Sequence, residues 1–213
     1  GNTFQKKTIK LGADIDLAGK EWTPIGNKEN KFQGTFDGAK SETENYTISN
    51  LKINNAELEY VGLFGILNTP GKIENVTVTN ANVTAKAQVG ALVGAAFTGS
   101  LSNCSVTGDV SISGFYKVGG LAGEGYAKIE SCAVTAESGS SVTGIYQKWN
   151  LEGDNVGGLV GFRGEGSVVT SGCVVNGLTV SGVRKVGGLI GSAFTDNTIS
   201  NCVVSNVGIV GTG

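Results

Sequence analysis

Short runs of alternating apolar and polar residues cover most of this chain, and glycine, asparagine or serine separates one run from the next. Val76–Thr79 and Val110–Ser113 are typical, and their period of two is that of a β-strand that buries one face. No segment carries an apolar stripe of period 3.6 over three turns, as an amphipathic helix would. The pattern therefore predicts an all-β protein made of many short strands.

A glycine-rich hexapeptide recurs along the chain at intervals of 28, 29, 38 and 30 residues. A second motif, of the form Ile-x-Asn-Cys-x-Val, runs in phase with it. Two motifs that share one period indicate a structural array. The copies of the hexapeptide are Val61–Gly65, Val89–Gly94, Val118–Gly123, Val156–Gly161 and Val186–Gly191, and the third residues of the second motif are Asn50, Asn75, Asn103, Ser131, Gly172 and Asn201.

A repeat of about three short strands cannot bury its apolar side alone, whereas stacked copies paired by parallel backbone hydrogen bonds bury a continuous interior. We therefore expect an all-β, single-stranded parallel β-helix of about six coils of roughly 28–30 residues, right-handed by the general rule for parallel crossovers. Residues 1–47 are expected to form an N-terminal capping segment and residues 48–213 the repeat helix, in one structural domain.

The second motif predicts a corner in each coil. Its apolar positions fall at 0, +3 and +5, which a flat strand cannot place on one face, so one residue between the first two must bend the chain. Asparagine and glycine tolerate the left-handed backbone conformation of such a bend, and stacked asparagines can hydrogen-bond to one another. The glycines of the hexapeptide are then positions of close approach between coils, and its leucines point inward.

The four cysteines all occupy the fourth position of the second motif, where Val76 and Leu51 stand in earlier coils. We interpret them as a column of buried free thiols that act as small hydrophobes. A disulfide between the stacked neighbours Cys104 and Cys132 remains the alternative. The cysteines are Cys104, Cys132, Cys173 and Cys202.

Composition excludes several classes of function. A net charge of −2 gives no reason to expect nucleic acid as a partner, and no apolar run is long enough to span a membrane. The glycine motif occurs five times without a following GK[ST], which argues against a phosphate loop. With no histidine and only scattered carboxylates such as Asp14 and Asp16, we expect no catalytic residue, no metal and no cofactor. A flat threonine array, as ice binding requires, is not expected, because threonine does not recur in phase.

A candidate ligand-binding face comes from an excess of residues between Cys132 and Val156. A loop with large aromatics adds nothing to a repeat core, and aromatic rings beside cations suit sugars or a partner protein. Stacking would place the neighbouring coils' aromatic and basic residues beside this loop. The alternative is that Trp149 folds back on the coil as a lid. The candidate residues are Phe115, Tyr116, Lys117, Tyr146, Lys148, Trp149, Arg184 and Lys185.

The hexapeptides contain GLFG, ALVG, GLAG, GLVG and GLIG, and they follow Ala13–Leu17, Trp22–Gly26 and Phe32–Gly38. In these features the chain resembles the bacterial GLUG-motif repeat proteins. The resemblance implies a secreted or surface-anchored bacterial protein that is adhesin-like, and it implies no catalytic residues. We expect a non-catalytic module for adhesion or display, with a carbohydrate-active β-helix enzyme as the alternative. Because Val207–Gly211 is still repeat-like, we also expect further chain or a partner to cover the C-terminal end.

Overall fold

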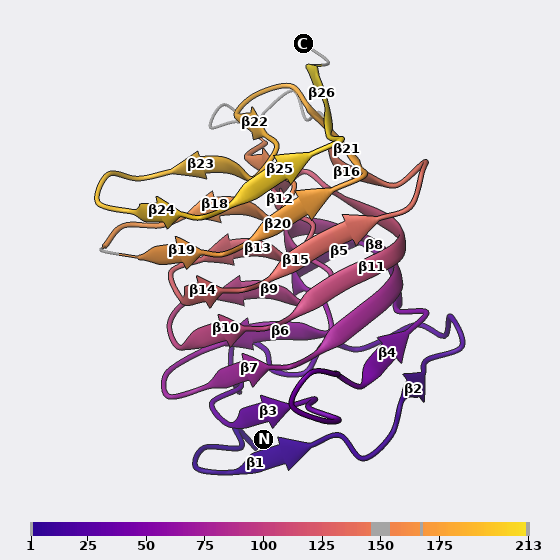
Figure 1. Ribbon diagram of the computed structural model, residues 1–213, viewed down its shortest axis with the longest axis vertical. Coiled ribbons are helices and arrows are strands. Elements are labelled where there is room, and N and C mark those ends of the chain that lie inside the picture. Colours follow the sequence, from indigo (N-terminus) through magenta and orange to yellow (C-terminus); the bar gives the residue numbers. More distant parts are fainter. Residues whose placement is uncertain (1, 146–153, 167, 212–213) are drawn as a thin grey trace.

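The computed structural model describes residues 2–145, 154–166 and 168–211, and these residues form a parallel β-solenoid of about seven turns without helices (Figure 1). Three parallel sheets run along the solenoid. As the chain rises from the indigo to the yellow end, it crosses the front of Figure 1 from left to right and returns behind, so the solenoid is right-handed as expected.

The first sheet has seven strands, one from each turn. In spatial order they are β1 (Thr8–Lys10), β3 (Thr35–Asp37), β7 (Lys72–Glu74), β10 (Ser100–Ser102), β14 (Lys128–Glu130), β19 (Val169–Ser171) and β24 (Thr198–Ser200).

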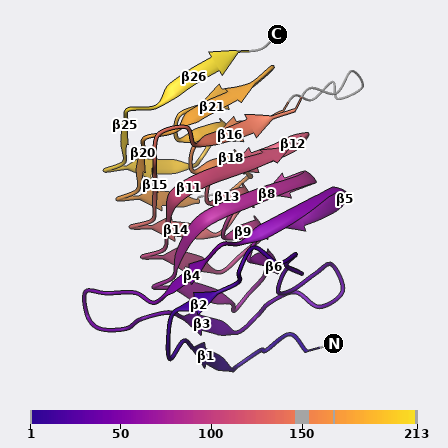
Figure 2. The same ribbon diagram turned by 90° about the vertical axis from the view of Figure 1, so that its right-hand side faces the viewer.

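The second sheet has 14 strands and bends along its length, so that β5, β8 and β11 each cross from one half to the other (Figure 2). Its strands are β2 (Ile15–Asp16), β4 (Thr47–Ser49), β5 (Lys52–Val61), β8 (Thr77–Val89), β11 (Ser105–Gly114), β12 (Tyr116–Gly119), β15 (Ala133–Ala136), β16 (Ser141–Gly144), β17 (Val156–Gly157), β20 (Val174–Asn176), β21 (Thr179–Gly182), β22 (Val186–Gly187), β25 (Val203–Ser205) and β26 (Gly208–Gly211).

The third sheet has five strands, and each follows a copy of the hexapeptide or overlaps its end. They are β6 (Phe64–Leu67), β9 (Val93–Ala96), β13 (Ala122–Gly125), β18 (Val160–Arg163) and β23 (Ile190–Ala193).

The N-terminal segment takes part in the stacking, which is why about seven turns are present where about six were expected. Strand β1 pairs with β3, and β2 pairs with β4, both in parallel. Isolated bridges from Ile25 to Phe64 and from Phe32 to Leu67 continue the third sheet downward. Residues 8–34 thus follow the path of a full turn.

The interior is built from columns of one residue per turn. Ile48, Val78, Val106, Val134 and Val175 follow one another in register and are buried. Of the inward leucines predicted from the hexapeptide, the first four are buried and Leu189, in the sixth turn, packs partly buried against the core. Each turn thus supplies one layer of a continuous hydrophobic core.

The predicted corners are confirmed, because all six corner residues have left-handed backbone dihedrals. The side chains form part of the expected ladder, since Asn103 Nδ2 donates to Asn75 Oδ1 at 2.9 Å and Asn75 Nδ2 donates to Asp37 Oδ1 at 2.9 Å. Ser131, which is neither asparagine nor glycine, adopts the same conformation. The φ values are 59° at Asn50, 58° at Asn75, 50° at Asn103, 52° at Ser131, 62° at Gly172 and 53° at Asn201.

The position of the first corner in the repeat is a correction. Ile73 pairs with Phe36, whereas Ile48 pairs with Val78, so Asn50 is not in register with Asn75. The Asn50 corner stacks below Asn80, which is also left-handed at φ 55°. The third turn has left-handed corners at both Asn75 and Asn80, and the sequence motif of the second turn corresponds to the second of these corners.

The glycines of the hexapeptide are sites of close approach, as expected. A Cβ at Gly94 would lie 2.2 Å from the backbone nitrogen of Val61, and one at Gly157 would lie 2.0 Å from the carbonyl oxygen of Val160. No side chain fits in these spaces. The glycines therefore allow the backbone to turn tightly at the edge of the third sheet.

Threonine does recur in phase, and the contrary expectation was wrong. Thr79, Thr107 and Thr135 are in register on the outer side of the second sheet, four residues after each corner. Their distance from the hexapeptide varies, because the length of chain between the two motifs varies. Hydroxyls in the neighbouring columns bond to one another, as Thr84 Oγ1 and Ser113 Oγ do at 2.9 Å.

All four cysteines are free, as expected, and they form one column behind the corners. Cys104, Cys132 and Cys173 are buried, and Cys202 is partly exposed. Val76, whose carbonyl oxygen accepts from Ser105 N, begins the column. Leu51 does not belong to it, because it follows the Asn50 corner and is equivalent to Ala81. Burial raises the pKa of Cys173 to about 12, and the contact with Cys104 followed by burial raises the pKa of Cys132.

The first prediction concerns the corner at Asn103. Asn103→Ala should lower the free energy of unfolding by about 1 to 2 kcal/mol, because alanine is strained at a left-handed φ and cannot donate to Asn75. Asn103→Gly should cost less, since it loses only the hydrogen bond. Urea unfolding of both variants would measure this, and a glycine variant less stable than the alanine variant would contradict it.

The second prediction concerns alkaline pH. An unfolded cysteine ionises at about pH 8.5. Since the folded pKa of Cys173 is higher, its stabilising contribution is present below that pH and is lost as the pH rises toward about 12. Between these values Cys173→Val should lose less stability than the natural chain, with valine chosen because Val76 fills the same column. Equal losses in urea unfolding at each pH would contradict the prediction.

Candidate functional site: an aromatic face

A second column of left-handed residues precedes the valine of every hexapeptide, and sequence inspection missed it. Two of these residues direct their side chains toward the outer side of the third sheet, where Tyr60 contacts Phe97 and Lys117 contacts Glu124. The column consists of Tyr60 (φ 61°), Gln88 (48°), Lys117 (55°), Asn155 (52°) and Lys185 (52°). We call the outer side of the third sheet, with the side chains that cover it, the aromatic face.

Two of the candidate residues from the sequence, Lys117 and Lys185, lie in one column at the upper end of this face. Lys117 N donates to the carbonyl oxygen of Asp154 at 2.7 Å, and Val156 N donates to the carbonyl oxygen of Lys185 at 3.0 Å. Lys117 and Lys185 therefore lie in one column with a single turn between them. Arg184 and Lys185 are exposed, while Phe115 and Tyr116 are partly exposed. Tyr146, Lys148 and Trp149 lie outside the described residues.

Lys117 is engaged in a buried ion pair. Its Nζ lies 2.6 Å from Glu124 Oε1, and the two side chains are only 12% and 5% exposed. The same Nζ lies 4.5 Å from the ring centroid of Phe162, and Tyr126 Oη donates to Glu124 Oε1 at 3.2 Å. Burial, and then the charge of Glu124, raises the pKa of Tyr126. This cluster fixes the aromatic rings around it.

Phe97, Tyr126 and Phe194 each lie three residues after the last glycine of a hexapeptide, and their rings belong to two separate aromatic contacts on this face. Phe97 lies 6.1 Å from Tyr126 and 6.0 Å from Tyr60 between ring centroids. Phe194 contacts Phe162 instead, at 5.6 Å. The turn between them has Gly164 in this column, and the ring of Tyr126 occupies the space where a side chain of Gly164 would lie.

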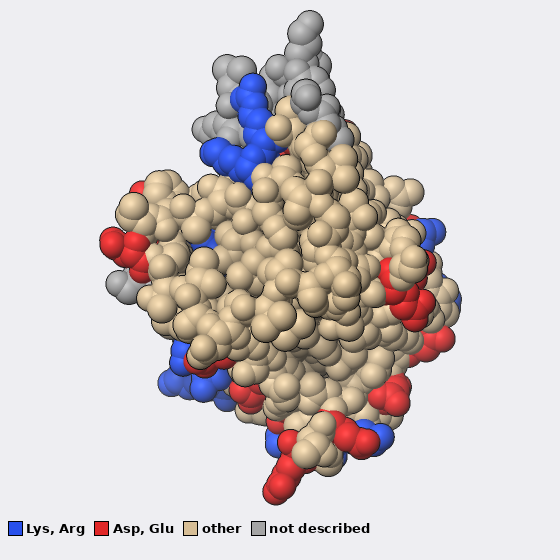
Figure 3. Space-filling model, turned by 45° about the horizontal axis from the view of Figure 1, so that its top comes forward, with Lys and Arg blue, Asp and Glu red and all other residues tan. Residues whose placement is uncertain are grey.

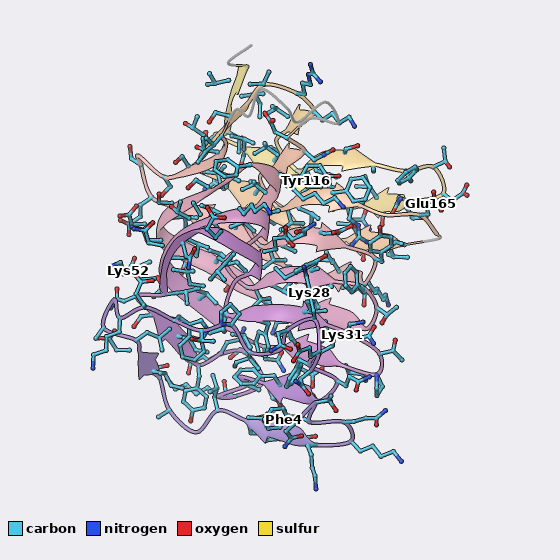
Figure 4. The ribbon with its side chains drawn as sticks, turned by 180° about the vertical axis from the view of Figure 1, so that it is seen from behind. Phe4, Lys28, Lys31, Lys52, Tyr116 and Glu165 are labelled. Atoms are coloured by element: carbon cyan, nitrogen blue, oxygen red, sulfur yellow. The ribbon has the colours of Figure 1, made fainter. Side chains whose placement is uncertain are left out.

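Two grooves open on the aromatic face. The lower one, which we call the tryptophan groove, has a volume of about 570 Å³ and lies where the turn of residues 26–31 faces β5. The upper one, of about 460 Å³, is lined by Phe97, Tyr126, Lys128 and Glu165. Figure 4 looks onto this side of the solenoid, with Lys28 and Lys31 below Tyr116. The tryptophan groove is lined chiefly by Trp22, Pro24, Lys28, Leu58, Glu59 and Tyr60.

The opposite side has a different character. Figure 3 shows the front and the top of the solenoid, where uncharged residues fill the centre and acidic side chains lie toward the margins. The outer columns of the second sheet explain this, because residues such as Thr79, Thr107 and Thr135 carry hydroxyls instead of charges. Aromatic rings with charged partners are thus concentrated on the aromatic face.

One carboxylate of the tryptophan groove, that of Glu59, is held by two lysines. Glu59 Oε2 lies 2.8 Å from Lys28 Nζ, and Glu59 Oε1 lies 3.0 Å from Lys86 Nζ. Lys28 and then Lys86 lower the pKa of Glu59, so this carboxylate stays ionised at neutral pH. Lys28 Nζ also lies 5.0 Å from the ring centroid of Tyr60. The charges and the ring form one connected network.

Asp14 and Asp16, considered from the sequence, and the buried Arg163 have structural roles. Asp14 Oδ1 accepts from Thr47 N at 2.8 Å, and Asp16 Oδ1 accepts from Ala18 N at 2.7 Å and from Asn50 Nδ2 at 2.8 Å. Arg163 is fully buried in the third sheet and donates to the carbonyl oxygens of Ala127 and Val169; burial lowers its pKa to about 10.

Within the described ranges there is no group of three or more histidine, cysteine or acidic side chains that could hold a metal ion. The same part of the chain contains no helix of the length and apolarity that would cross a membrane.

Two relatives share sequence with parts of this chain. Halomucin of Haloquadratum walsbyi is 36% identical over 153 residues, which are 66% of this chain and 2% of halomucin. A "Putative Gly-rich membrane protein" of Evansella cellulosilytica is 37% identical over 101 residues, which are 46% of this chain and 11% of that protein. The chain thus spans a small part of the length of these relatives.

One solved structure is similar over nearly the whole chain. It is the crystal structure of a "putative immunoglobulin A1 protease" from Bacteroides ovatus, with a TM-score of 0.66 and 24% sequence identity, and the match covers 96% of this chain and 61% of that one. At this identity the similarity is one of fold.

The family model described as "The GLUG motif" matches residues 87–111. This segment contains the hexapeptide Val89–Gly94 and the corner Asn103, and both features recur in register in the neighbouring turns. The chain is therefore a parallel β-solenoid that contains a GLUG motif at residues 87–111.

Proposed function

We propose that this chain is a non-catalytic glycan-binding module of a surface or secreted protein, and that it binds its ligand on the aromatic face. The observation that carries the proposal is that two grooves lined by aromatic rings and charged side chains lie on the same side of an otherwise regular solenoid. Neither groove is needed for the stacking of the turns.

Glycans suit this surface for a physical reason. Sugar rings present apolar C–H faces and a rim of hydroxyl groups, so they bind best where flat aromatic rings lie beside fixed polar groups. The row formed by Tyr60, Phe97 and Tyr126 supplies rings in successive turns. The charged side chains of Lys28, Glu59 and Lys128 line the two grooves along this row.

A non-catalytic role is supported by the state of the reactive groups. The chain has no histidine, and the raised pKa values of Cys132 and Cys173 keep these thiols protonated and unreactive. Glu59 is ionised, whereas a glycosidase needs one carboxyl group with a raised pKa as its acid. These observations disfavour a carbohydrate-active enzyme, the alternative from the sequence, and a cysteine peptidase.

The surface location is supported by the names of relatives, one described as a halomucin and another as a membrane protein. An adhesin-like role in a longer protein accords with a repeat module that spans a small share of those relatives. The basic residues Arg184 and Lys185 at the upper end of the face would then lie beside the bound glycan.

The third prediction tests the aromatic face. On an array of immobilised glycans the chain should bind at least one structure, and Tyr116→Ala or Trp22→Ala should weaken that binding about tenfold, the cost of removing a central aromatic contact. Thr107→Ala, on the hydroxyl-bearing side, serves as the control and should bind normally. Absence of binding, or binding that neither aromatic substitution changes, would contradict the proposal.

A further inference from the structure

We infer that the tryptophan groove is a binding site for a neutral sugar of a glycan chain. The inference rests on the proposed function and makes it specific, because it names both the place and the class of ligand. Three features carry it: an interruption of the repeat, a fixed aromatic floor and the balance of charge in the groove.

The groove lies where a bulge in β5 interrupts the repeat. Strand β5 is in register with β8 up to the pair Asn55 and Ala85, and pairing resumes at Glu59 and Ala87. Three residues of β5 therefore lie opposite one residue of β8, so that Glu57 and Leu58 are additional. Such bulges redirect side chains and are common beside binding sites.

The bulge forms one wall of the groove. Leu58 is 39% exposed, and Glu57 N donates to Asn55 Oδ1 at 3.0 Å, which holds the bulge in shape. The opposite wall is the turn of residues 26–31. Asn27 Oδ1 accepts from the backbone nitrogens of Glu29 at 3.0 Å and Asn30 at 2.8 Å, so this turn is also fixed by local hydrogen bonds. Both walls are preorganised.

Trp22 gives the groove a flat apolar surface. Its indole Nε1 donates to the carbonyl oxygen of Leu63 at 3.0 Å, and its backbone nitrogen donates to the carbonyl oxygen of Lys52 at 2.9 Å. The ring is partly exposed, and its orientation is set by these bonds before any ligand arrives. Pro24 and Leu58 extend the apolar surface within the groove. An oriented ring of this kind can stack against the C–H face of a sugar.

The charges favour a neutral sugar. Lys28 is the only basic residue among those that line the groove in the described structure, against Glu29, Glu57 and Glu59. Lys28 and Lys86 are already paired with Glu59. A uronate or sulfated sugar would meet net negative charge, whereas neutral hydroxyl groups can donate to these carboxylates.

The experiment measures calorimetric binding of hexasaccharides to the full chain. The probes are cellohexaose, mannohexaose and a galactan hexasaccharide as neutral sugars, and a hexamer of galacturonate as the acidic counterpart. The main variant deletes Glu57 and Leu58, which restores residue-for-residue pairing of β5 with β8 and should leave the fold intact. Trp22→Ala is the second variant, Thr107→Ala is the control, and thermal unfolding checks that each variant is folded.

At least one neutral hexasaccharide should bind, with the galacturonate hexamer at least tenfold weaker. The deletion and Trp22→Ala should each weaken binding of the neutral hexasaccharide at least tenfold, and Thr107→Ala should leave that binding unchanged. A folded deletion variant that binds as the natural chain does would overturn the inference, as would preference for galacturonate. If binding is instead lost in Tyr116→Ala, the proposed function stands and this site for it is wrong; if no glycan binds, on the array or in solution, both fail.

Discussion

The structure depends on parallel backbone hydrogen bonding between successive turns. Every described strand pairs in parallel with a strand of a neighbouring turn, and the pairing keeps one register along each sheet except at the bulges of β5 and β11. Because side chains alternate across a strand, this register decides which residues enter the interior. A column such as Val78, Val106 and Val134 is buried as a unit, so each turn closes the apolar layer of the turn below it. No turn has a hydrophobic core without its neighbours.

A solenoid held in this way must turn sharply several times in each repeat, and this explains its left-handed residues. Asparagine at the corners combines a tolerated backbone conformation with a side chain that bonds along the axis, as between Asn103 and Asn75. Glycine in the hexapeptide meets a different demand, because the backbone of a neighbouring segment occupies the place of a side chain. The free cysteines have no such constraint, and valine can fill their column. Each residue type in the repeat therefore answers a separate physical need.

Departures from the repeat are where the surface acquires specific chemistry. The bulge of β5 opens the tryptophan groove, Gly164 separates the two aromatic contacts, and the longer fifth turn brings Asp154 beside the backbone nitrogens of Val183 and Arg184. At the bulge of β5 the register is re-established on either side of the extra residues. A regular array can thus support local binding features, as loops do on other rigid scaffolds.

The sequence by itself determined the parallel β-solenoid, its period, the left-handed corners and the column of free cysteines, because each is a local requirement repeated in phase. It also placed Lys117 and Lys185 at equivalent positions, immediately before the valine of their hexapeptides. Tertiary structure alone decided that Asn50 stacks with Asn80, that Lys117 forms an ion pair with Glu124, and that Arg163 is buried. It also brought Trp22 and Lys28 against Glu59 and Tyr60, more than 30 residues away. These contacts follow from the pairing register, which the lengths of irregular connections set and a repeat pattern does not encode.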